Sequence, residues 1–159
     1  MCGCGTDEYN YGIHAYSLLS AVMGPGIRSV RHLRAGAQRR IQVNWEDDRV
    51  AFLTVGDAGY IPMYATAVSL MEVTHLVPQS GKLYRALLET TLPYLAGEKE
   101  SPLPIEVLVE PELCAMAARK SWLSGDREVL LSDLNEADGG YDGALFAAGY
   151  KKMRYPQGW

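Results

Sequence analysis

The sequence predicts an α+β domain, in which an open, mostly antiparallel sheet carries helices packed on one face. A helical apolar stripe near the start and two helical segments after residue 80 enclose a central stretch with the alternation of strands. The turns inside that stretch are short, which favours antiparallel neighbours with one covered face. The length of 159 residues suits one domain with a substantial core, because such a chain buries roughly 70% of its unfolded surface.

The composition excludes several classes of protein. Hydrophobic residues make up 48% and charged residues 21% of the chain, which argues against disorder along its whole length. The formal charge of -4 gives no indication of a nucleic-acid partner. The start lacks the pattern of a signal peptide and no apolar run could span a bilayer, so we expect no membrane partner and a cytoplasmic location. Three cysteines make a poor disulfide framework and favour a reducing compartment.

The first predicted element is a helix over Tyr9–Met23, because its apolar residues recur at helical spacing. The run Gly24-Pro25-Gly26 ends it, since proline cannot continue a helix and glycine tolerates the terminating backbone. The apolar stripe comprises Ala15, Leu18, Leu19, Val22 and Met23.

Strands are predicted next. Ile27–Arg34 is the first, and Arg40–Trp45 alternates apolar and polar residues as a half-buried strand does. The acidic residues 46–48 predict a hairpin turn, after which Arg49–Val55 is the return strand. Residues 56–62 read as a loop, and Met63–Val77 is rich in strand-forming residues and predicts one or two more strands.

Helices return in the second half. We expect helices over Lys82–Leu95 and Pro111–Leu123, with residues 105–110 as a shorter helix kinked into the second, and a closing strand over Arg127–Leu131. Residues 135–159 are rich in glycine and tyrosine and predict an irregular tail docked on a domain that spans residues 1–134.

Several catalytic and cofactor motifs are absent. The G-x-G runs at 3–5 and 24–26 lack the third glycine of the dinucleotide fingerprint, and no P-loop, G-x-S-x-G or H-E-x-x-H occurs.

Cys2 and Cys4 with His14 could offer zinc ligands, but a structural site normally needs four ligands. We therefore expect no metal, and free thiols at a frayed terminus. Cys114 lies among apolar neighbours and is predicted to be a small buried hydrophobe.

A local basic cluster has two interpretations. It could bind phosphates or acidic substrates, or it could be a solvated strand face paired with the acidic turn at 46–48. The overall acidity favours the second interpretation. The cluster comprises Arg28, Arg31, His32, Arg34, Arg39 and Arg40.

His14 is the single residue with the clearest chemical potential. It lies in the first predicted helix, about one turn after Asn10 and Tyr11. An unperturbed imidazole titrates near 6.5, which suits acid–base chemistry close to neutral pH. The alternative is a packed, hydrogen-bonded histidine with no catalytic role.

Three stretches in order resemble the C-terminal domain of Gfo/Idh/MocA-family oxidoreductases. The first is Tyr11-Gly12-Ile13-His14 running to Gly24-Pro25-Gly26, and the second is Ile27-Arg28-Ser29-Val30. The third is Leu83–Gly97 followed by the small-residue-rich run Ala117–Gly125 and a closing strand. The resemblance covers about Tyr11–Leu134.

The resemblance implies a specific role for this chain. Members of the family are two-domain enzymes that use NAD or NADP to act on sugars, inositols or related polyols. An N-terminal Rossmann domain binds the dinucleotide and carries a catalytic lysine, while the C-terminal domain supplies substrate contacts and the oligomer interface. The resemblance assigns catalysis to His14 and substrate binding to Asn10 and Tyr11. Asn10 and Ser17 stand where the family often has aspartates.

The whole nucleotide-binding half is missing from the sequence. We therefore expect a substrate-binding and oligomerisation domain that is inactive and binds no cofactor alone. Its expected partners are a sugar-like substrate, a separate Rossmann domain and further copies that associate through the open sheet face. The alternative is a non-catalytic dimerising scaffold protein, with Ile41, Val43, Trp45 and residues 63–68 on the uncovered face.

Overall fold

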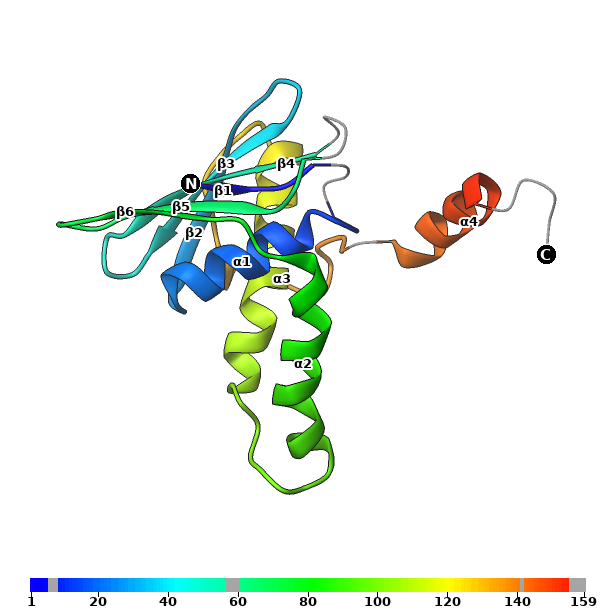
Figure 1. Ribbon diagram of the computed structural model, residues 1–159. Coiled ribbons are helices and arrows are strands. Elements are labelled where there is room, and N and C mark those ends of the chain that lie inside the picture. The colour runs from blue at the N-terminus through cyan, green and yellow to red at the C-terminus, as the bar shows by residue number, and fades with distance from the viewer. Residues whose placement is uncertain (6–8, 57–60, 141, 155–159) are drawn as a thin grey trace.

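The computed structural model describes residues 1–5, 9–56, 61–140 and 142–154 (Figure 1). Its seven strands form one sheet, and two of its helices, α1 and α3, lie against that sheet. The strands are β1 (Cys2–Gly3), β2 (Ile27–Ala35), β3 (Arg39–Trp45), β4 (Val50–Val55), β5 (Tyr64–Val68), β6 (Val73–Leu76) and β7 (Val129–Leu130). The helices are α1 (Ile13–Met23), α2 (Ser80–Leu95), α3 (Ile105–Leu123) and α4 (Gly143–Arg154), with a short 3-10 turn, η1, at Leu131–Asp133.

The sheet has the order β6-β5-β1-β4-β3-β2-β7. Every neighbouring pair is antiparallel except β1 and β4, which run parallel. The consecutive strands β2, β3 and β4 form a meander, as their short predicted turns require. The predicted α+β class with an open, mostly antiparallel sheet is therefore confirmed.

The core lies between the sheet and the helices α1 and α3. Helix α1 contributes buried Ala15, Tyr16 and Leu19, and α3 contributes a row of small residues that includes Cys114. Small residues allow the helix backbone to approach the sheet closely. The sheet side of the core consists of Val30, Ile41, Val43, Trp45, Leu53 and Val55, all with 0% exposure.

This arrangement corrects the scaffold hypothesis in one respect. Ile41, Val43 and Trp45 were expected on the uncovered face of the sheet, but they form part of the core beneath the helices, as does Ala65. Alternation separates the two faces of a strand without telling which face the helices take. The uncovered face instead presents the intervening residues, among them Arg40, Gln42, Val50 and Phe52.

The first residues are a second correction. They were expected to be a frayed terminus with free thiols, but β1 is an internal strand between β4 and β5, and Cys2 and Cys4 are buried. Gly3 makes this possible, because a Cβ added there would lie 2.3 Å from Thr54 Oγ1 and 2.9 Å from Tyr64 Oη. Those two side chains hydrogen-bond to each other at 3.0 Å across β1.

The late elements also differ from expectation. Residues 105–110 are not a separate helix but the first turns of α3, which continues through the buried Pro111. Part of the tail, expected to be irregular, forms helix α4.

Two side chains of α3 hold the segment that precedes α4. The ammonium of Lys120 contacts Asp138 at 2.8 Å, and Arg119 donates to the carbonyl of Gly139. The division into a domain of residues 1–134 and a docked tail remains a prediction.

We predict that Gly3→Ala lowers the free energy of unfolding by about 1–3 kcal/mol, since the new methyl group must displace the Thr54–Tyr64 pair and the backbone behind it. Chemical denaturation would measure the loss. Gly81→Ala in α2 is the matched control, because no atom lies within 4 Å of its added Cβ. Equal stability of the two variants would show that β1 tolerates a side chain.

Candidate functional site

The entry into α1 is where the predicted site residues gather. Residues 9–12 wind into the helix through hydrogen bonds from the amide of Ile13 to Tyr9 O at 3.0 Å and from the amide of His14 to Tyr11 O at 3.1 Å. The hydroxyl of Tyr9 donates to Ala115 O on α3 at 3.1 Å. This bond fixes the start of α1 against the middle of α3.

The buried side of α1 is fixed to β1 by two thiols. Cys2 Sγ donates to Ala15 O at 3.4 Å, and Cys4 Sγ donates to Tyr11 O at 3.5 Å. The two carbonyls lie one turn apart, that of Ala15 in α1 and that of Tyr11 in the turn that leads into it, and the two cysteines lie on the same face of the extended chain. The rotation of α1 about its own axis is set by these contacts and by the buried Tyr16 and Leu19.

The opposite side of α1 is exposed and polar. Asn10, His14 and Ser17 lie about one turn apart along it, and all three are exposed. The ring of Tyr11 meets the His14 imidazole edge-on, with centroids 5.3 Å apart and planes at 84°. The structure therefore brings Asn10, Tyr11 and His14 together at one end of α1, with the imidazole open to solvent.

A hollow of about 410 Å³ adjoins this end of α1. It lies between the start of α1 and the middle of α3, and its floor is largely apolar. Asn10 contributes an amide to its rim, and Glu112 contributes a carboxylate from α3. An amide and a carboxylate can both hydrogen-bond hydroxyl groups. His14 does not line the hollow, but it follows Asn10 by about one turn, and an imidazole can exchange a proton. The lining of the hollow comprises Tyr9, Asn10, Ile13, Glu112, Ala115 and Met116.

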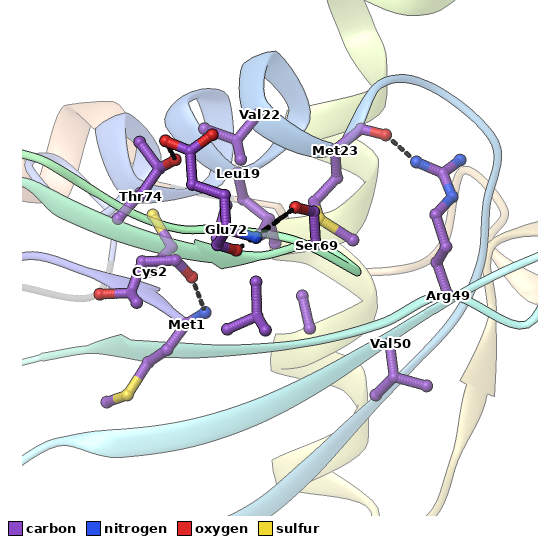
Figure 2. A pocket seen from close by; sticks show the side chains of 15 residues that line it. Met1, Cys2, Leu19, Val22, Met23, Arg49, Val50, Ser69, Glu72 and Thr74 are labelled. Atoms are coloured by element: carbon purple, nitrogen blue, oxygen red, sulfur yellow. Dashed lines mark hydrogen bonds between the residues drawn. The ribbon is translucent and has the colours of Figure 1, made fainter.

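A larger hollow, of about 470 Å³, lies at the other end of α1 (Figure 2). Leu19, Val22 and Met23 of α1 line one side of it, and the β5–β6 hairpin lines the other. Arg49 also lines this hollow, and its guanidinium already donates hydrogen bonds to Asp47 and to the carbonyl of Met23. Val22 is two helical turns beyond His14, which is about 12 Å along the axis. The larger hollow is therefore separate from the predicted site.

The basic cluster does not form one patch. The guanidinium of Arg39 lies 4.4 Å from the centre of the Trp122 ring, and Arg31 donates to Asp126 O at 3.0 Å. His32 is buried, with Nδ1 2.6 Å from Asp126 Oδ1. The acidic turn pairs outside the cluster, since Arg49 holds Asp47 and its hydrogen bond lowers the pKa of that carboxyl.

Sequence reasoning missed Glu112 and the His32–Asp126 pair. Neither has a local signal in the sequence. Glu112 meets Asn10 at the hollow although about 100 positions separate them, and His32 and Asp126 are 94 positions apart.

Among the described residues, no group of three or more His, Cys, Asp or Glu side chains could hold a metal ion. His14 and the two N-terminal cysteines lie on opposite sides of α1. Within the same part of the chain, no helix is both long and apolar enough to cross a membrane.

Comparisons with known proteins identify the fold. No family model and no curated protein matches the sequence. A putative NADPH-dependent oxidoreductase from Desulfitobacterium hafniense matches 78% of this chain and 47% of its own, with a TM-score of 0.59 and 13% identity. GenD2 from gentamicin A biosynthesis, solved with NAD, matches 82% and 48%, with a TM-score of 0.54 and 17% identity.

An NAD-binding protein from Listeria innocua has the same fold, with a TM-score of 0.52 and 15% identity over 76% of this chain and 46% of its own. The chain thus spans about half the length of each of these structures. At such identities the likeness shows the fold alone. It agrees with the resemblance to a C-terminal oxidoreductase domain that the sequence carries.

The buried thiols predict alkaline sensitivity. Burial raises the pKa of Cys2 from 9.0 to about 12 and also raises the pKa of Cys114. Because the folded pKa is above the unfolded one, the stabilisation is complete below pH 9 and declines as the pH rises from 9 toward 12. We expect the free energy of unfolding to fall by up to about 1.4 kcal/mol per pH unit for each such thiol.

Urea denaturation between about pH 8 and pH 10.5 would measure this slope. The double variant Cys2→Ala/Cys114→Ala is the control, since tyrosines and lysines also titrate in this range. The variant should lose stability less steeply than the natural chain. Parallel slopes would contradict the role of the buried thiols.

Proposed function

We propose that this chain is the substrate-binding and oligomerisation half of an NAD(P)-dependent oxidoreductase. The observation that carries the proposal is the fold, which the chain shares with about half of each of three oxidoreductase or NAD-binding structures. The proposed substrate is a sugar, an inositol or a related polyol. A separate Rossmann domain holds the dinucleotide, and the chain alone is inactive.

The glycine runs at 3–5 and 24–26, within the part of the chain that the structure describes, do not fit the phosphates of a dinucleotide. Phosphates bind free backbone amides at a glycine-rich turn. Here the amides of Cys4 and Gly5 donate to Thr54 O and Ile61 O, and the amide of Gly24 donates to Ser20 O. The amide of Gly26 donates to the carboxylate of Glu110 at 2.8 Å. Hydride chemistry therefore belongs to the other half, and we assign no step of it to this chain.

The proposed work of this chain is to bind the polyol and move its proton. Hydroxyl groups of the substrate hydrogen-bond to Asn10 and Glu112 at the rim of the hollow between α1 and α3. An imidazole nitrogen of His14 accepts the proton of the reacting hydroxyl during oxidation and returns it during reduction. Tyr11 packs against the imidazole and limits its rotation. The exposure of His14 leaves room for a second domain to close over it.

Binding of polyols to the chain alone tests this assignment. We expect myo-inositol or D-glucose to perturb NMR signals at Asn10, His14 and Glu112. His14→Ala and Asn10→Ala should each weaken the binding about three- to tenfold, the effect of one lost hydrogen bond. His75→Ala, a second exposed histidine that bonds Thr66 on β5, is the control. Perturbation confined to the larger hollow, or tight binding of NAD by the chain alone, would contradict the proposal.

The proposed oligomer interface is the uncovered face of the sheet. Phe52 and Val50 on β4 are 47% and 48% exposed there, and Leu130 on β7 is 40% exposed. Asn44 and Ser29 lie between Val50 and Leu130 across the sheet, so the apolar strip of this face is the pair Val50 and Phe52 on β4. This strip also supports the alternative function, a non-catalytic dimerising scaffold. The two functions differ in whether a polyol binds at the end of α1.

We expect Phe52→Lys to weaken association by this face, because it places a charge in an apolar contact. Sedimentation velocity would show a smaller species than the natural chain gives at the same concentration. Leu123→Lys, an exposed position at the end of α3, is the control. An unchanged distribution for Phe52→Lys would remove the sheet face as an interface.

A further inference from the structure

A helical arm projects from the body of the molecule (Figure 1). It consists of α2, the loop 96–104 and the first turns of α3 at 105–110. None of the described side chains of α2 is buried. Its apolar residues cover about half of the helix circumference, as expected of a helix that packs against something. The most exposed large apolar residues of α2 are Tyr84, Leu87, Leu88, Leu92 and Leu95.

The arm is incomplete as it stands. An isolated helix of about this length is marginal in water, so α2 needs tertiary contacts to persist. The total accessible surface is 10666 Å², whereas a compact monomer of 17.5 kDa exposes roughly 7,900 Å². The excess of roughly 2,800 Å² is as large as one partner's share of an obligate dimer interface. The arm and α4 are the parts that extend from the body (Figure 1).

The charges along α2 are arranged unequally. Arg85 and Glu89 form a salt bridge at 2.7 Å one turn apart within α2, so these two charges are paired inside one copy. Lys82 leaves a positive charge at the start of α2, and Glu98 and Glu100, with Lys99 between them, leave a net negative charge in the loop at the tip. Two such arms attract each other at their ends when they run antiparallel.

We propose that the arm is a homotypic interface, in which the arms of two copies pack antiparallel about a two-fold axis. Each arm supplies two antiparallel helical segments, so the pair forms a four-helix bundle with the apolar faces inside. Lys82 at the start of each α2 then lies near Glu98 and Glu100 at the tip of the partner's arm. This proposal does not rest on the proposed oxidoreductase function or on the sheet-face interface.

A second copy suits the arm better than a body that covers His14. Helix α2 has 16 residues and is therefore about 24 Å long. The arm carries apolar residues along that whole length, from Leu83 to Leu95, and its tip points away from the sheet (Figure 1). Another arm has the same length and the reversed order of charges.

A single apolar substitution tests the interface. Leu95→Glu should halve the molar mass measured by light scattering after gel filtration, since Leu95 is 73% exposed and contributes little to the fold of one copy. Leu145→Glu on α4 is the matched control, because that leucine is also 73% exposed. A natural chain that stays monomeric at high concentration, or a Leu95→Glu variant that keeps the natural mass, would overturn the proposal.

Charge reversal gives a test that loss of folding cannot imitate. Lys82→Glu makes both ends of the arm acidic, and Glu98→Lys/Glu100→Lys makes both ends basic. Each change suits the helix dipole at its own end of α2 and leaves the salt bridge between Arg85 and Glu89 in place, so α2 should remain helical. Each variant alone should give half the natural molar mass, and an equimolar mixture should restore it. A mixture that stays dissociated would overturn the antiparallel arrangement.

Discussion

The candidate site depends on the contact between α1 and β1. Cys2 and Cys4 lie on one side of the extended N-terminal segment. They reach the carbonyls of Ala15 in α1 and of Tyr11 in the preceding turn, which are one turn apart. A repeat of two residues along a strand is about 6.6 Å, and one helical turn is 5.4 Å, so successive cysteines meet successive turns. The helix therefore cannot rotate without losing both thiol contacts. This orientation is what places His14 on the solvent side.

Local patterns in the sequence predicted most of the elements but not the faces they present. The alternation in β3 and β4 and the apolar stripe of α1 are local, and the structure confirms the strands and the helix. β1 has only two residues, too few for any periodicity, and its pairing with β4 and β5 comes from residues more than fifty positions away. The grouping of Asn10, Tyr11 and His14 follows from helical spacing. Glu112 could not be predicted, since only the packing of α1 on α3 brings it there.

The unoccupied surfaces are as informative as the core. The core closes around the sheet and two helices, while the end of α1, the apolar strip on β4 and the helical arm all remain open. These surfaces lie on different parts of the chain, so one partner of ordinary size does not cover all of them. The chain matches about half the length of three longer structures, and we propose that a second domain covers the first surface and that contacts between copies cover the others.

The position of β1 has a consequence for the order of folding. The meander β2–β3–β4 closes short loops and can form early, whereas the contact between the N-terminal amine and Thr66 O spans 65 residues. We expect β1 to insert between β4 and β5 only after both strands exist. The helix that carries His14 is then fixed against the sheet in the last stage of assembly. The proposed site is thus completed only when the two ends of this long loop have met.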